Sequence, residues 1–150
     1  MMSANEAALG RLQELVVVLS EDMEQGLAAL GLTRSRAHVL WELHRCGPVT
    51  QRTLSDALRV TPRNVTGLVD ALVDGGFVSR EPHPTDRRAT LITLTGSGAE
   101  TAAAMAAGQR DLADQLFGSL PPGGVEEFTA TLDHLLAQIR SQQGAGGAQR

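Results

Sequence analysis

Two groups of arginine and polar residues near the middle of the chain have types and spacing that suit the binding of nucleic acid. Arg63, Asn64 and Thr66 lie at the start of one predicted helix, and Arg87 and Arg88 are adjacent in a short turn. Arginine can form two hydrogen bonds with guanine, and asparagine can pair with adenine in the same way. A helix with short polar side chains beside a basic hairpin tip suits a major groove and the neighbouring minor groove.

The elements that carry these residues are predicted from the pattern of residues 61–95. Thr61 is a good N-cap, Pro62 suits the first helical position, and Gly75-Gly76 ends the helix. One face of this helix is apolar and is formed by Val65, Leu68, Val69 and Leu72. Residues alternate in character over 90–95, which predicts a strand, so the two arginines occupy the tip of a β-hairpin.

Two helices are predicted before this segment. Thr33 caps a helix that runs to Cys46, and Thr50 caps a short helix with the sequence QRTLSDAL. The short helix and the one that follows it make a helix-turn-helix, and the hairpin makes it winged. We therefore expect a DNA-binding lobe over residues 33–95.

Further contacts to the DNA backbone are expected near the starts of these helices. Gln51 and Arg52 begin the short helix, where they suit phosphate contact, and the backbone amide of Thr61 is placed to reach a phosphate. Arg36 and Arg80 are additional candidates.

The distribution of charge supports this reading although the net charge is −4. Between residues 34 and 88 there are nine arginines against six acidic residues, whereas the remainder has four arginines against eleven acidic residues. Every basic residue is arginine, which binds phosphate through two parallel hydrogen bonds. Positive charge concentrated in one segment is typical of nucleic-acid binding; ordinary surface arginine is the alternative.

The two ends of the chain carry long amphipathic helices, predicted over 5–31 and 122–142. In the first, apolar residues recur every three or four positions, close to a heptad repeat. We interpret the pair as a dimerisation lobe, although an ordinary core-facing helix would show the same stripe. A connecting helix is predicted over 97–118 and a flexible tail over 143–150, within a single domain of residues 1–150.

Several classes of protein are excluded by composition and motif. No apolar run approaches the roughly 20 residues of a membrane span, and no secretory signal is evident at the N-terminus. The lone Cys46 cannot form an internal disulfide, so we expect a cytoplasmic protein. No glycine-rich phosphate loop, nucleophile elbow or zinc-ligand spacing occurs, so we expect no enzyme, cofactor or metal site.

One pattern resembles a known family. The run Asp86-x-Arg88-x₃-Ile92-x-Leu94-Thr95-x₂-Gly98 is similar to the wing signature of the multiple antibiotic resistance regulator (MarR) family. The resemblance implies a mainly α fold with a small β-hairpin wing, as a winged helix-turn-helix with a dimerisation lobe from the terminal helices. It further implies a dimeric transcriptional regulator on a pseudo-palindromic operator, usually a repressor released by a small aromatic or anionic ligand. Arg88 would then enter the minor groove and Asp86 would orient it, with a turn-forming side chain as the alternative role of Asp86.

The sequence offers two candidates for a site that responds to an effector. His38 and Trp41 lie one helical turn apart and are candidates for a ligand site, with a packed core tryptophan as the alternative. Cys46 allows a redox-responsive regulator, although a buried structural thiol is the simpler interpretation. A winged-helix module that binds protein and not DNA is a third reading, which leaves Arg87 and Arg88 without a role.

Overall fold

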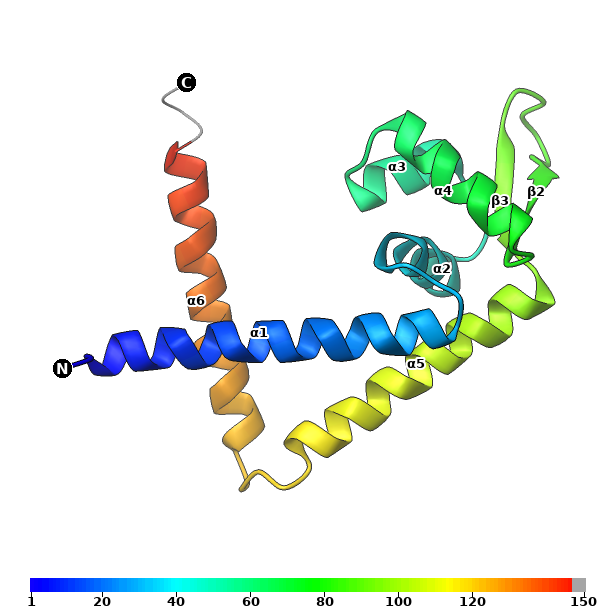
Figure 1. Cartoon of the computed structure of the whole chain (residues 1–150). Coiled ribbons are helices and arrows are strands. Elements are labelled where there is room, and N and C mark those ends of the chain that lie inside the picture. The colour runs from blue at the N-terminus through cyan, green and yellow to red at the C-terminus, as the bar shows by residue number, and fades with distance from the viewer. Residues whose placement is uncertain (147–150) are drawn as a thin grey trace. The chain divides into compact units, whose positions relative to one another are not determined.

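The structure is a computed structural model that describes residues 1–146 (Figure 1). Its elements are, in order, α1 (Ala4–Ala29), α2 (Arg34–Cys46), β1 (Val49–Thr50), α3 (Gln51–Leu58), α4 (Pro62–Asp74), β2 (Val78–Pro82), β3 (Thr90–Leu94), α5 (Gly96–Phe117) and α6 (Gly124–Gly146). The mainly helical fold with a small sheet is therefore confirmed. The chain divides within α5 into two compact units, Met1–Ala106 and Ala107–Arg150. None of the helices in residues 1–146 has the length and apolar character needed to cross a membrane.

The first unit is built around a winged-helix core. Helices α2, α3 and α4 pack together and the sheet closes the core. The largest side chains with no solvent exposure or almost none are Leu40, Leu43, Leu54, Leu72, Ile92, Val39, Val65 and Val69. Most of them come from the three helices, so apolar burial fixes α4 against α2 and α3 and leaves its opposite face free.

The predicted helix starts are confirmed, because three threonines cap the helices of this core. The hydroxyl of Thr33 accepts a hydrogen bond from the N–H of Arg36, Thr50 from Thr53, and Thr61 from Asn64, at 3.2–3.3 Å. Each bond satisfies one of the first-turn N–H groups that have no partner within a helix.

The sheet has three antiparallel strands in the order β1-β3-β2. The hairpin β2–β3 was predicted, but β1, which pairs Val49 with Ile92, was not. A strand of two residues is too short to show alternation in a sequence, so the pairing with β3 alone defines it.

The wing joins α5 at a tight junction around Thr95 and Gly98. The Thr95 hydroxyl accepts a hydrogen bond from the Gly98 N–H at 3.0 Å and donates to the Gly76 carbonyl at 2.6 Å. A Cβ on residue 98 would lie 1.8 Å from the carbonyl oxygen of Phe77, so only glycine fits. The helix begins at Gly96, one residue before the predicted start at 97, because Thr95 caps it.

The long helices differ from their predicted ranges mainly at their ends. Helix α1 ends at Ala29 where residue 31 was predicted, and α6 begins at Gly124 and not at 122. The predicted flexible tail is helical over residues 143–146, and its remainder, 147–150, lies outside the described residues.

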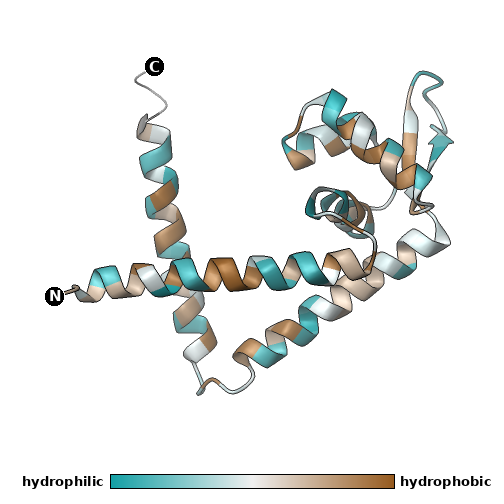
Figure 2. Cartoon of the chain, viewed as in Figure 1, coloured by the Kyte–Doolittle hydropathy of each residue, from teal (hydrophilic) through white to brown (hydrophobic). Residues whose placement is uncertain are grey.

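Both terminal helices present apolar side chains to solvent. Figure 2 shows a hydrophobic block midway along α1 and hydrophobic turns along α6. In α1 the exposed apolar residues are Leu9, Leu15, Val16, Val17, Val18 and Met23, and in α6 they are Val125, Phe128, Leu135, Leu136 and Ile139. Within the second unit, the rings of Phe117 and Phe128 pack with their centroids 5.7 Å apart.

Candidate nucleic-acid interface

The polar face of α4 carries the residues predicted to read DNA bases. Arg63, Asn64 and Thr66 are all exposed, while Val65 on the opposite face is fully buried. Among the described residues, the side chains of Arg63 and Asn64 have no hydrogen-bond or ion-pair partner. They are therefore free to bind an external ligand with their full hydrogen-bonding capacity.

The tip of the wing is a loop closed by backbone hydrogen bonds. The His83 N–H donates to the Ala89 carbonyl at 3.3 Å, and the Ala89 N–H donates to the Asp86 carbonyl at 3.2 Å. Arg87 and Arg88 are exposed at this tip, and neither forms an ion pair within residues 1–146. The loop thus presents two adjacent guanidinium groups to solvent.

Asp86 has the turn-forming role in this loop and does not orient the Arg88 guanidinium. Its carboxylate accepts a hydrogen bond from the backbone N–H of Arg88 at 2.9 Å and does not contact the guanidinium. This is a side-chain turn of the kind that aspartate favours. Asp86 therefore fixes the direction of the chain at Arg88 and leaves the arginine side chain itself unrestrained.

His83 is a second organiser of the loop, and the sequence pattern did not identify it. Its Nδ1 accepts hydrogen bonds from the N–H groups of Thr85 at 3.2 Å and Asp86 at 3.0 Å. A ring nitrogen that accepts hydrogen bonds carries no proton, so this geometry belongs to neutral imidazole protonated at Nε2. A histidine directly before Pro84 in a hairpin tip is the signal that could have indicated it.

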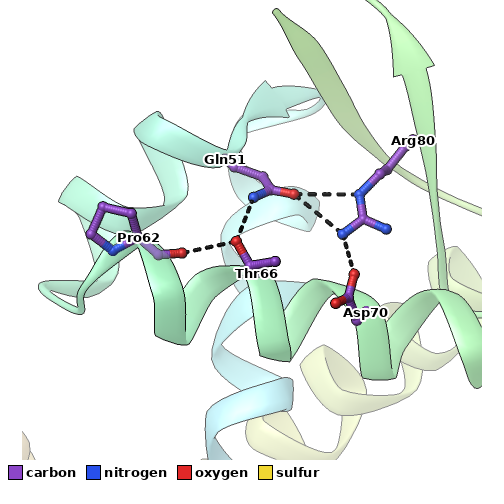
Figure 3. A network of polar contacts seen from close by, with 5 residues as sticks. All are labelled: Gln51, Pro62, Thr66, Asp70 and Arg80. Carbon is purple, nitrogen blue, oxygen red and sulfur yellow. Dashed lines mark hydrogen bonds and ion pairs between the residues drawn. The ribbon is translucent and has the colours of Figure 1, made fainter.

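A polar network links the starts of α3 and α4 to the wing (Figure 3). The Arg80 guanidinium donates to the Gln51 side-chain oxygen at 3.3 and 3.4 Å and pairs with the Asp70 carboxylate. Gln51 donates in turn to the Thr66 hydroxyl at 3.2 Å, which donates to the Pro62 carbonyl at 3.0 Å. The Gln51 side chain, predicted to contact phosphate, has both ends of its amide occupied within the protein.

Arg52 and Thr61 remain predicted phosphate contacts. Arg52 is exposed in the first turn of α3, and the Thr61 hydroxyl is engaged as the N-cap of α4. Arg36, a further candidate, is half-buried on α2. The structure thus brings the predicted residues of α3, α4 and the wing into one compact unit.

The candidate effector residues lie on α2. His38 is exposed and Trp41 is half-buried, with its ring 6.0 Å from that of His44. In residues 1–146, no three His, Cys, Asp or Glu side chains are grouped so that they could hold a metal ion.

Cys46 is exposed, so the prediction of a buried thiol is wrong: the residue ends α2 and lies outside the buried face of that helix. Its thiol donates to a Glu42 oxygen at 3.4 Å, and this hydrogen bond is the main reason why the thiol pKa is raised. The positive charge of Arg45 acts in the opposite direction and lowers that pKa. A raised pKa reduces the thiolate population, which is the form that reacts with oxidants.

Comparison with known proteins places this site in a family context. The MarR family model matches residues 32–90. The chain is 41% identical to an uncharacterised HTH-type transcriptional regulator of Mycobacterium leprae, over 44% of this chain and 46% of that protein. It is 34% identical to the HTH-type transcriptional repressor NicR of Pseudomonas putida, over 77% of this chain and 71% of NicR.

A solved structure extends the similarity to a complex with DNA. A mutant MarR from Escherichia coli, crystallised with operator DNA, has a TM-score of 0.65 to this chain and 31% identity. The similarity covers 88% of this chain and 93% of that one.

Proposed function

The chain belongs to the MarR family of winged helix-turn-helix transcriptional regulators, and on this basis we propose that it is a homodimeric repressor. It binds a pseudo-palindromic operator through α4 and the wing, and a small aromatic or anionic ligand releases it. The contacts to DNA come from Gln51, Arg52, Thr61, Arg63, Asn64, Thr66, Arg87 and Arg88, with Gln51 acting through its backbone or after rearrangement.

One observation carries the DNA-binding part of this proposal. Arg63 and Asn64 on α4 and Arg87 and Arg88 on the wing are exposed in the same compact unit, and their side chains are unpaired within residues 1–146. Unpaired arginines at two separate elements can reach base edges in one groove and phosphates or the minor groove beside it. A protein-interaction module would give this arrangement no role.

The dimer is supported by the apolar surfaces of the terminal helices. A buried aliphatic side chain contributes about 1.5 kcal/mol or more, so burying the six exposed apolar side chains of α1 gives roughly 9 kcal/mol. Association costs an estimated 4–15 kcal/mol, which a single stripe only balances. Stripes on both α1 and α6, contributed by each of two subunits, exceed that cost.

Repression and release by a ligand are two further parts of the proposal, and each has its own support. Repression is supported by the similarity to NicR, whose name gives that role. For the ligand, His38 and Trp41 on α2 are the candidates. The redox alternative has less support, since the pKa of Cys46 is raised and the chain has no second cysteine for an internal disulfide.

The proposal can be tested by selecting duplexes from a random library with the purified full-length protein and footprinting the enriched sequence. We expect two half-sites related by twofold symmetry, with centres about 10 base pairs, one helical turn, apart. Analytical ultracentrifugation should give two subunits per duplex. No enriched sequence, or a single asymmetric half-site bound by one subunit, would refute the proposal.

The ligand part requires a separate measurement. A thermal-shift screen of small aromatic acids, with and without the selected duplex, should find a compound that raises the melting temperature of the free protein and lowers its affinity for the duplex. If none of these compounds weakens the complex with the duplex, release by a small aromatic ligand is refuted.

A further inference from the structure

We propose that Arg80 is a positioning residue that fixes the wing against the recognition helix α4, through Asp70 and Gln51, and does not itself contact DNA. This inference rests on the proposed function, because it assigns a role in DNA binding. In the same site, Gln51 and Asp70 have the structural role of holding the Arg80 guanidinium.

Arg80 lies on the inner face of the sheet. Arg80 on β2 pairs with Ile92 on β3, and Ile92 pairs in turn with Val49 on β1. Directly opposed residues in an antiparallel sheet project from the same face. Ile92 has no solvent exposure, so Arg80 lies on the face that is turned toward the helices.

The outer half of β2, beyond Arg80, has no buried apolar side chain that would hold it against the helices. Val78, two residues before Arg80 on the same face, is buried, whereas Glu81 and Pro82 are exposed. Hydrophobic burial thus holds the base of β2 but not its outer half. The guanidinium of Arg80 provides the attachment to the helices at the point where burial ends.

The bonds of Arg80 reach two different helices. Its Nη2 donates to Asp70 on α4 and to Gln51 at the start of α3, and its Nε donates to the same Gln51 oxygen. A planar guanidinium with several fixed donors restrains both partners more narrowly than a single ammonium could. The Arg80 side chain is 34% exposed and that of Asp70 56%, so the pair is open to solvent and contributes little to folding stability.

The network continues into the first turns of α4. The Gln51 amide donates to the Thr66 hydroxyl, which donates to the Pro62 carbonyl (Figure 3). Pro62, Thr66 and Asp70 are four residues apart and therefore form one stripe along α4. Arg63, the residue after Pro62, lies beside this stripe, so the wing is connected to the first turn of α4, where the predicted base contacts begin.

This connection matters because the wing and α4 must engage a single duplex at the same time. A wing that is free to move relative to α4 would have to be ordered on binding, and that ordering weakens affinity. We expect Arg80→Ala to weaken binding to the selected duplex by about tenfold. The salt dependence of duplex binding should be the same in this variant as in the natural protein, because a guanidinium that neutralises no phosphate releases no counterions.

Asp70→Asn provides the sharper test. Simple electrostatics predicts that removing a negative charge near DNA tightens binding. If Asp70 instead holds Arg80 in place, the variant should bind the selected duplex more weakly than the natural protein, though less weakly than Arg80→Ala, because the bonds from Arg80 to Gln51 remain. The double variant should be no weaker than Arg80→Ala, since that substitution already removes the bond to Asp70.

The experiment measures duplex affinity by fluorescence anisotropy at several salt concentrations for the natural protein and these three variants. Arg34→Ala is the matched control, because it removes an exposed arginine–carboxylate pair, with Glu24 at 3.7 Å, that does not involve the wing. Arg80→Lys retains the positive charge but lacks the planar guanidinium with its several donors. It should give an intermediate loss of affinity for the duplex. If Arg80→Ala does not fold, the nearly isosteric Asp70→Asn carries the test alone.

Two outcomes in this assay would overturn the inference. A salt slope that falls by about 0.9 in Arg80→Ala would mean that Arg80 contacts a phosphate directly. Unchanged affinity in Arg80→Ala, or tighter binding by Asp70→Asn, would mean that the connection does not position the wing.

A second measurement needs no DNA. Amide hydrogen exchange in the free proteins should become faster over residues 79–91 in both Arg80→Ala and Asp70→Asn, with α2 unchanged. Unaltered exchange in the wing would refute the positioning role even if the protein selects no duplex. Failure of this inference and failure of the proposed function are therefore distinguishable.

Discussion

The backbone N–H of Arg88 donates to the carboxylate of Asp86 at 2.9 Å, and the Arg88 guanidinium is left without an acidic partner in residues 1–146. The aspartate thus shapes the turn without neutralising the arginine. A wing tip built this way holds its backbone in place while the charge remains available for a phosphate or a minor groove.

Replacing Arg88 with alanine should therefore reduce affinity for the selected duplex at least tenfold, or about 1.4 kcal/mol. The turn itself should persist, because Asp86 binds the backbone N–H, which alanine retains. Arg110→Ala, which removes an exposed arginine from α5, should bind normally. Gel-shift titration measures affinity and ultracentrifugation the subunit number; full affinity in Arg88→Ala would exclude the wing from the interface.

His83→Ala should also weaken binding, by an indirect route. The alanine removes the acceptor for the N–H groups of Thr85 and Asp86, so the tip loses its internal order before it meets DNA. We expect a loss of about 1 kcal/mol, comparable to one hydrogen bond, measured on the same duplex. His134→Ala on α6 is the control. If the two histidine variants bind alike, His83 has no role in preparing the loop.

Local features of the fold were predictable from sequence, because they depend on neighbouring residues. The threonine caps act on N–H groups three residues away, and the alternation of β3 is contained in five residues. The exposed arginines of α4 and the wing were predictable in the same way, from residue type and helical or strand period.

The connections between elements were not predictable. Gln51 and Arg80 are 29 residues apart, and nothing in the spacing of either residue indicates that they meet. Gln51 was accordingly assigned to phosphate, and Arg80 was only an additional DNA candidate. The same limit applies to β1, whose two residues become a strand only by pairing with β3.

Gly98→Ala should be one of the most destabilising substitutions in the first unit. Its methyl group would lie 1.8 Å from the Phe77 carbonyl oxygen, which is backbone and cannot rotate away. We expect a loss of about 3 kcal/mol in the free energy of unfolding, measured by urea denaturation. Gly67→Ala is the control, because its methyl group meets open space within an exposed helix and should stabilise by roughly 0.5–1 kcal/mol. Equal stability of the two variants would mean that the junction of wing and α5 is looser than described.

Glu42→Gln should increase the reactivity of Cys46. The Glu42 carboxylate accepts the thiol hydrogen bond and repels the thiolate, and both effects raise the thiol pKa. Removing that charge lowers the pKa, so more thiolate is present at pH 8 and alkylation by iodoacetamide should be several-fold faster. Arg45→Gln should have the opposite effect, since the Arg45 charge lowers the same pKa. If Glu42→Gln reacts no faster than the natural protein, Glu42 does not suppress the thiolate, and the redox-responsive alternative regains support.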